Sequence, residues 1–279
     1  MSTIVLAVGS VTILGLLCAV MLAVASKIMV VKVDERMARI REVLPGANCG
    51  ACGFSGCDGY AGALVNEGVM TNLCTPGGDK TSKEISGVLG VEAADVLECV
   101  AAVYCSGDGA SRLRKMDYAG ISTCAAAKQL YGGQYACAYG CLGFGDCAAV
   151  CPEGAICMES GLPRVDTRKC VGCRLCAGAC PKKVILMDYS VSTAAVLCKN
   201  TEKGAVVRKK CANGCIGCMK CVKECPTEAI TMIENLARID QSKCSGCGHC
   251  AEICVVKCIR MASGPAKVES IGLRGDDGG

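Results

Sequence analysis

The sequence has few aromatic residues and no tryptophan. Tyrosine occurs seven times and phenylalanine twice in 279 residues. A core with so few large side chains needs another source of stability, and bound metal can supply one. The sequence also lacks a compact basic patch with interleaved aromatic residues, which argues against nucleic acid as a partner.

Motifs that carry catalysis are also scarce. There is no G-x-G-x-x-G dinucleotide loop after a strand, and no convincing pair of nucleophile and base. The single histidine, His249, lies within "CGHC", where a solvated or sulfur-contacting loop position explains it more simply than a general base. We therefore expect no catalytic residue and no substrate-transforming site on this chain.

An uncharged stretch at the amino terminus predicts a membrane anchor. Residues 3–26 contain no charged side chain, and as a helix these 24 residues would rise about 36 Å, enough to cross a bilayer. The sequence Ala23–Val24–Ala25 resembles a signal-peptide cleavage site, but no basic residue precedes the run, which is also too long for a signal peptide. Basic residues follow it, so the positive-inside rule predicts a single-pass anchor in the inner membrane with the remaining domains in the cytoplasm.

Cysteine is the most informative residue type, with 28 copies. The cysteines lie in tight runs with two or three residues between them, which suits metal ligation better than a web of disulfides. A cytoplasmic location agrees, because the cytosol keeps thiols reduced. The formal net charge of +4 treats every cysteine as neutral. A [4Fe–4S] cluster on four thiolates carries about −2 when oxidised, so several clusters would make the protein acidic.

The first cysteine group follows a short predicted helix that Pro45 ends. Glycines inside "NCGACGFSGC" let the backbone wrap closely around a bound group. Four thiolates from this stretch and from "LCTPGG" could ligate a cubane cluster, which we favour, or a zinc ion. The residues concerned are Cys49, Cys52, Cys57 and Cys74.

An internal repeat of 74 residues organises the second half of the chain. The segment "GLPRVDTRKC" (161–170) recurs as "NLARIDQSKC" (235–244), and the same offset relates the surrounding cysteines without a gap. Each unit is itself twofold and follows the C-x₂-C-x₂-C-x₃-C-P pattern of bacterial two-cluster ferredoxins, where the fourth cysteine of each run ligates the other cluster. One run of the first unit has Phe144 in place of a cysteine, and one run of the second has Val255 in place of the proline. Three ligand sets are complete: Cys151, Cys170, Cys173 and Cys176; Cys215, Cys218, Cys221 and Cys254; and Cys225, Cys244, Cys247 and Cys250.

The fourth set of the repeat is incomplete. Phe144 lies at the position where the second unit has Cys218, which leaves only Cys141, Cys147 and Cys180. We expect Cys137 to supply the missing thiolate. The alternatives are a [3Fe–4S] cluster on three cysteines, or a contribution from Cys124.

Five clusters would use 20 cysteines and bind about 20 iron atoms. A sixth site that uses Cys105 and Cys124 is a less favoured possibility. The simplest expectation for the cysteines left over is a buried, apolar thiol. These are Cys18, Cys99, Cys105, Cys124, Cys157, Cys198, Cys211 and Cys258.

The predicted fold is α+β and follows this cysteine pattern. Short helices should surround the first group, and each repeat unit should form a small ferredoxin-like module with hairpin strands. The predicted parts are an anchor (1–27), a [4Fe–4S] domain (28–80), a helical connector (81–135), ferredoxin module 1 (136–187), a linker (188–207), ferredoxin module 2 (208–262) and a flexible tail (263–279).

The arrangement resembles the iron–sulfur B component of the Rnf complex, the ion-translocating ferredoxin:NAD⁺ oxidoreductase of bacterial membranes. The resemblance covers about residues 1–262 and rests on "LPGANCGACGFSGCDGYAGAL", "CTPGG" and the paired ferredoxin units, which look like the longer form of this component. It implies a relay of electrons from soluble reduced ferredoxin to membrane and flavin-bearing partners, which reduce NAD⁺ and move Na⁺ or H⁺. The alternatives are a membrane-tethered iron–sulfur redox sensor or scaffold, and a relay subunit of another membrane oxidoreductase such as a hydrogenase.

Overall fold

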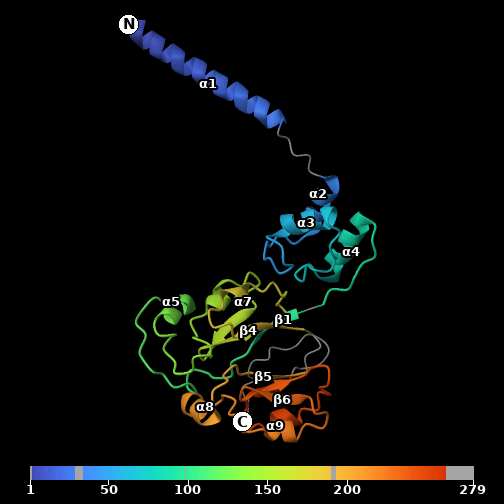
Figure 1. The fold of residues 1–279 in the computed structure, drawn as a ribbon, viewed down its shortest axis with the longest axis vertical. Helices are drawn as coiled ribbons and strands as arrows, with labels where there is room; N and C mark the ends of the chain where they lie inside the picture. Colours follow the sequence, from blue (N-terminus) through green and yellow to red (C-terminus); the bar gives the residue numbers. More distant parts are fainter. Residues whose placement is uncertain (1, 29–33, 98, 190–192, 262–279) are drawn as a thin grey trace.

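The computed structural model describes residues 2–28, 34–97, 99–189 and 193–261. It consists of a long amino-terminal helix, a small helical domain and two ferredoxin modules that stack on each other (Figure 1). The predicted α+β class is confirmed. The predicted flexible tail at 263–279 lies outside the described residues.

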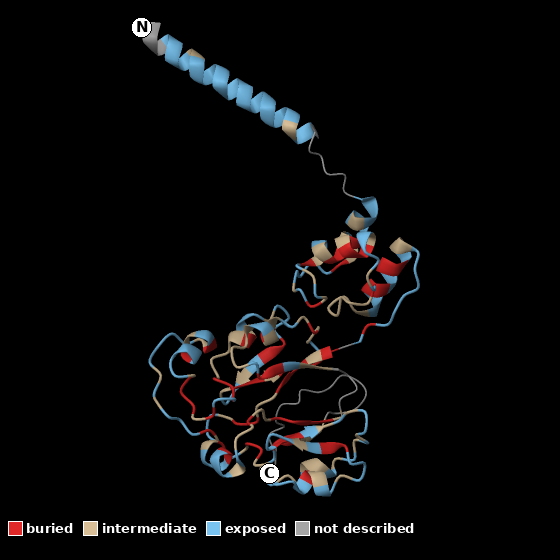
Figure 2. Cartoon of the chain, in the orientation of Figure 1, coloured by how far each residue is buried: buried red, intermediate tan, exposed pale blue. Residues whose placement is uncertain are grey.

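Helix α1 (Ser2–Ile28) stands apart from the rest of the chain (Figure 1). Its segment Val5–Lys27 has a mean hydropathy of 2.6, and none of it is buried within the protein. Figure 2 shows this exposure along the helix. By length and composition the helix can cross a membrane, because 23 residues of α-helix rise about 35 Å.

Three helices form the helical domain: α2 (Glu35–Val43), α3 (Cys57–Asn66) and α4 (Gly78–Leu89). The Asp34 carboxylate caps α2 by accepting a hydrogen bond from the Arg36 backbone N–H at 2.8 Å. Ile40 from α2, Tyr60 from α3 and Ile85 from α4 are almost fully buried against one another. This small core positions the loop that carries the first cysteine group.

Ferredoxin module 1 contains two antiparallel strand pairs. Strands β2 (Ile156–Glu159) and β3 (Leu162–Val165) form a hairpin, and β4 (Ile185–Tyr189) pairs with β1 (Cys99–Val103). Short helices α6 (Asp146–Ala149) and α7 (Leu175–Ala179) follow the cysteine loops. Helix α5 (Cys124–Gln129) precedes the module in the chain.

Part of the connector differs from the helix that we predicted. Residues 99–103 form β1, whose residues are nearly all buried and whose Ala101 lies opposite Met187 of β4. A short apolar run such as "CVAAV" has the same composition in a buried strand as in a buried helix, so its pattern could not separate the two. Pairing with β4 stabilises the strand, because hydrogen bonds between the two strands satisfy the backbone N–H and C=O groups of both.

Ferredoxin module 2 repeats this plan. Strands β6 (Ile230–Ile233) and β7 (Leu236–Ile239) form its hairpin, and β8 (Ile259–Met261) pairs with β5 (Ala194–Val196). The predicted linker therefore contributes a strand to this module. The helices are α8 (Gly204–Lys210), α9 (Lys220–Lys223) and α10 (His249–Glu252).

Direct contacts join the two modules. Ser106 and Asn213 exchange hydrogen bonds, with the Ser106 hydroxyl donating to the Asn213 carbonyl at 2.8 Å. Arg112 forms an isolated β-bridge with Cys211, and Leu197 packs against Tyr104. Buried residues accordingly continue from one module into the other (Figure 2).

Candidate metal centres

All 28 cysteines are free thiols in the structure, and 24 of them gather in six groups of four. We number these groups from the helical domain outward. Site 1 is Cys49, Cys52, Cys57 and Cys74; site 2 is Cys151, Cys170, Cys173 and Cys176; site 3 is Cys124, Cys141, Cys147 and Cys180. Site 4 is Cys105, Cys137, Cys198 and Cys211; site 5 is Cys215, Cys218, Cys221 and Cys254; site 6 is Cys225, Cys244, Cys247 and Cys250.

Site 1 lies in the loop between α2 and α3 and in the turn before α4. The Asn48 side-chain oxygen accepts a hydrogen bond from the Cys57 backbone N–H at 2.9 Å and so fixes the loop at the start of α3. Gly53 has a φ of 92°, a conformation that favours glycine. Burial raises the pKa of the Cys74 thiol, and the charges of the other three thiolates raise it further.

The four thiols of site 2 line a pocket in module 1. Backbone N–H groups point at two of its sulfurs: Ala101 donates to Cys170 Sγ at 3.5 Å, and Ala155 donates to Cys151 Sγ at 3.3 Å. Ala101 belongs to β1, so the strand that replaced the predicted helix also serves this site. Donors of this kind stabilise anionic sulfur.

Site 6 is the equivalent pocket in module 2. The Thr193 hydroxyl donates a hydrogen bond to Cys244 Sγ at 2.9 Å, and Thr227 lies 3.7 Å from Cys225 Sγ. Cys247 is exposed to solvent, whereas the other three thiols are half-buried.

Site 5 is the second group in module 2. Cys215 and Cys221 are buried in the module core, and Cys218 is exposed. A hydrogen bond from Cys258 lowers the pKa of Cys215 to about 6 and that of Cys254 to about 5. Both thiols therefore favour the thiolate form, which is the form that binds metal.

Site 3 differs from our expectation, because the structure places Cys124 beside Cys141, Cys147 and Cys180 around one pocket. Cys137 does not line this pocket. The Asp146 carboxylate accepts hydrogen bonds from the backbone N–H groups of Cys124 at 2.8 Å and Ala125 at 3.0 Å, which holds the start of α5 against the cysteine loop. The Phe144 ring packs edge-on against Tyr118 in the same small apolar cluster as Cys124.

Site 4 lies where the modules meet. From the sequence we weighed a sixth site only as a less favoured possibility, on Cys105 and Cys124; the structure places Cys105 here and Cys124 at site 3. The four cysteines of site 4 line one pocket. The Cys141 backbone N–H donates to Cys105 Sγ at 3.5 Å, and the Asn200 side-chain amide donates to Cys137 Sγ at 3.6 Å. At Gly107, a Cβ atom would lie only 2.8 Å from Cys211 Sγ, so this approach requires glycine.

The spacing of the thiols favours a cluster over a single ion. Four thiolates on one zinc ion lie about 3.8 Å apart, given Zn–S bonds of about 2.3 Å. In the part of the chain that the structure describes, no three Cys, His, Asp or Glu side chains stand close enough to hold one metal ion. The thiols of sites 2, 3, 4 and 6 instead line pockets, an arrangement that suits a cubane with four corner irons.

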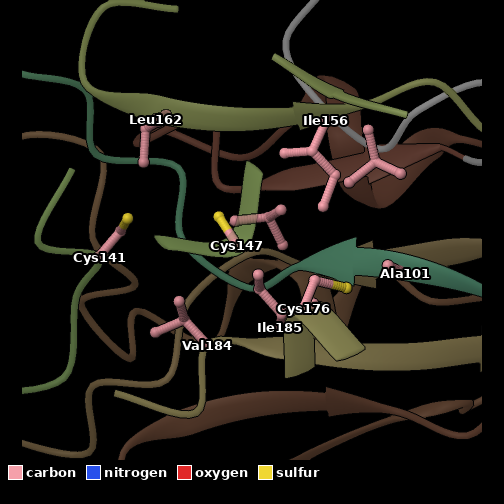
Figure 3. Close-up of a cluster of buried hydrophobic side chains, with 10 residues drawn as sticks. Ala101, Cys141, Cys147, Ile156, Leu162, Cys176, Val184 and Ile185 are labelled. Atoms are coloured by element: carbon pink, nitrogen blue, oxygen red, sulfur yellow. The ribbon is translucent and has the colours of Figure 1, made fainter. Parts of the chain in front are cut away.

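Thiols of successive sites lie close to one another. Burial is the main cause of the raised pKa of five thiols, and the charge of a thiolate in the next site raises each pKa further. Figure 3 shows Cys141 and Cys147 of site 3 and Cys176 of site 2 in one apolar core. The pairs are Cys49 with Cys173, Cys147 with Cys176, Cys105 with Cys141, Cys198 with Cys215, and Cys221 with Cys250.

Three family models match parts of the chain. The model described as "Putative Fe-S cluster" matches residues 44–76, which include site 1. A 4Fe-4S binding domain matches residues 163–186, and a 4Fe-4S dicluster domain matches residues 214–262.

Curated relatives cover most of the chain. It is 45% identical over 244 residues to the B component of the proton-translocating ferredoxin:NAD(+) oxidoreductase complex of Clostridium ljungdahlii, an alignment that spans 87% of this chain and 86% of that protein. It is 38% identical over 244 residues to the B component of the Na(+)-translocating complex of Acetobacterium woodii, spanning 87% and 73% of the two chains. The B component of an ion-translocating oxidoreductase complex from Methanosarcina acetivorans is 39% identical over 231 residues, spanning 82% of this chain and 88% of its own.

Proposed function

Because this chain belongs to the family of B components of the ferredoxin:NAD⁺ oxidoreductase (Rnf) complexes, we propose that sites 1 to 6 form one row of [4Fe–4S] clusters that connects soluble ferredoxin to the membrane part of the complex. The chain is an iron–sulfur electron-transfer subunit of such a complex and is associated with the membrane. The number of clusters, their ligands and their order are the content of the proposal.

Each site has the donors that a cubane requires. Four thiols are present at every site, and N–H or O–H groups reach sulfurs at sites 2, 4 and 6. A bound cluster supplies one-electron redox chemistry at low potential. The protein holds it, excludes water from buried thiols such as Cys141, and adjusts its potential through these donors.

The order of the sites supports the proposed row. In each pair of successive sites, the charge of a thiolate in one site raises the pKa of a thiol in the other, from Cys173 of site 2, which faces Cys49, to Cys221 of site 5, which faces Cys250. The Thr75 hydroxyl, beside site 1, donates to the Gly172 carbonyl at site 2 at 3.3 Å. In this order, site 4 is the connection between the modules.

The ends of the row suggest where partners act. Cys218 of site 5 and Cys247 of site 6 are exposed, while the thiols of sites 1 to 4 are buried or half-buried. We therefore assign ferredoxin to module 2 and the membrane partners to the helical domain beside the anchor. Basic residues after α1, such as Arg36 and Arg39, favour a cytoplasmic location for all six sites.

Metal content tests this proposal directly. Six clusters predict about 24 iron atoms and as much acid-labile sulfide per chain after anaerobic purification, whereas the five clusters first expected predict about 20. Zinc without sulfide would contradict the proposal. Rapid reduction by ferredoxin separates a relay from a redox sensor, and co-purification with a flavin-bearing, NAD⁺-reducing partner separates this complex from a hydrogenase.

Exchange of single ligands distinguishes sites 3 and 4. Cys124→Ala removes one thiolate from site 3, so we expect loss of between one and four irons and a changed EPR signal from module 1. Cys137→Ala should leave that signal intact and remove the signal of site 4. If Cys137→Ala changed the EPR signal of site 3 and Cys124→Ala did not, Cys137 would be the fourth ligand beside Cys141. Cys157→Ala is the matched control, since Cys157 is exposed and belongs to no site.

A further inference from the structure

Cys258 is a buried cysteine that belongs to none of the six sites. Cys258 is 1% exposed and lies in the core of module 2 with Ile230 and Leu236. Its backbone carbonyl accepts a hydrogen bond from the Leu197 N–H at 2.7 Å, which fixes its place beside β5. Buried thiols often act as small apolar side chains, so its role depends on what the sulfur touches.

The Cys258 sulfur contacts a thiol of site 5. It lies 3.7 Å from Cys254 Sγ, within hydrogen-bond distance for two sulfurs. A thiol offers one S–H donor, whereas a thiolate that ligates iron can only accept. In this contact, Cys258 is therefore the residue that keeps its proton.

The internal repeat provides a natural comparison. The residue 74 positions earlier is Val184, which is 0% exposed and lines the cavity of site 3. The Val184 carbonyl accepts a hydrogen bond from the Tyr104 N–H at 2.7 Å, as the Cys258 carbonyl does from Leu197. The two positions share backbone contacts and burial, but only Cys258 carries a donor.

We propose that the Cys258 S–H group donates to the Cys254 thiolate of site 5 and thereby raises the reduction potential of the cluster there, a contribution that the site 3 cluster lacks. The inference rests on the proposed function, since it requires clusters at both sites. Reduction adds negative charge that is shared with the ligating sulfurs, so a hydrogen bond to a sulfur favours the reduced state. Val184 provides no such bond.

Reciprocal variants of the full-length, anaerobically purified chain test this inference. We expect Cys258→Val to lower the midpoint potential of the site 5 cluster without loss of iron. Val184→Cys should raise the potential of the site 3 cluster, and Cys258→Ser, which keeps a donor, should hold the site 5 potential at or above its original value. EPR-monitored redox titration gives the potentials, and Cys218→Ala identifies the site 5 signal.

Several results would overturn the inference. Unchanged potentials in both Cys258→Val and Val184→Cys would reduce Cys258 to a packing residue. Iron loss in Cys258→Val, or full iron content in Cys254→Ala, would make Cys258 a ligand instead. Val184→Cys keeps the test valid if Cys258→Val fails to fold. An original chain without iron and sulfide would count against the proposed function itself, which separates the two failures.

Discussion

Replacing both Cys105 and Cys198 with alanine is expected to stop electron flow between the two modules. These residues supply two of the four thiols of site 4, while sites 3 and 5 keep complete sets. Tunnelling rates fall exponentially with distance, so loss of the middle site should slow the crossing by orders of magnitude. Stopped-flow reduction by ferredoxin should then show rapid reduction of module 2 and very slow reduction of module 1 and the helical domain.

A matched control supports this experiment. Cys18→Ala combined with Cys157→Ala also removes two cysteines, both exposed and outside the six sites, and should leave all rates unchanged. Iron content should fall by about four atoms in the Cys105/Cys198 variant and by none in the control. Rapid reduction of all remaining clusters in the Cys105/Cys198 variant would show that electrons cross without site 4.

Removal of iron is expected to unfold both modules. Cys141, Cys147 and Cys176 are part of the core of module 1, and its other buried side chains are small or aliphatic. Structural zinc contributes about 10–16 kcal/mol to small metal-binding domains, which equals or exceeds the 5–15 kcal/mol that stabilises a typical domain. If a cubane contributes on that scale, the modules cannot remain folded without it.

Circular dichroism and limited proteolysis can test this expectation after chelation under oxidising conditions with a reductant added afterwards. The strand signal and the protease resistance of residues 99–261 should be lost, while α1, which no site supports, should stay helical in detergent. Retention of the strand pairs β2–β3 and β6–β7 in iron-free protein would show that the clusters do not determine the fold.

Local spacing predicted the ligand sets whose members lie in one motif. Sites 2, 5 and 6 each draw three cysteines from a C-x₂-C-x₂-C run and the fourth from the other half of the same module, so the repeat was enough to group them. The four cysteines of site 1 were likewise grouped from the sequence, three in its glycine-rich loop and the fourth in "LCTPGG". The structure brings these four sets together as the sequence indicated.

Site 4 could not be grouped by spacing, because its cysteines come from four separate segments. Contacts such as the Ser106–Asn213 pair bring those segments together, and they depend on how the modules pack. The available signal was indirect: Cys137 and Cys211 correspond in the repeat, as do Cys124 and Cys198, and none of the four fits the ferredoxin motif. The same packing explains site 3, where Asp146 holds Cys124 in place, and β1, which needs β4 to become a strand.

The dispersed ligands of site 4 have a consequence for biosynthesis. Its first thiol, Cys105, precedes module 1, and its last, Cys211, is translated only when module 2 has begun. The site therefore gains its last thiol only after module 1 has all of its cysteines, and before any thiol of site 5 or site 6 has been translated, so the joint between the modules can be completed after module 1 and ahead of module 2. A chain truncated after module 1 would lack Cys198 and Cys211 and so would carry only Cys105 and Cys137 of this site.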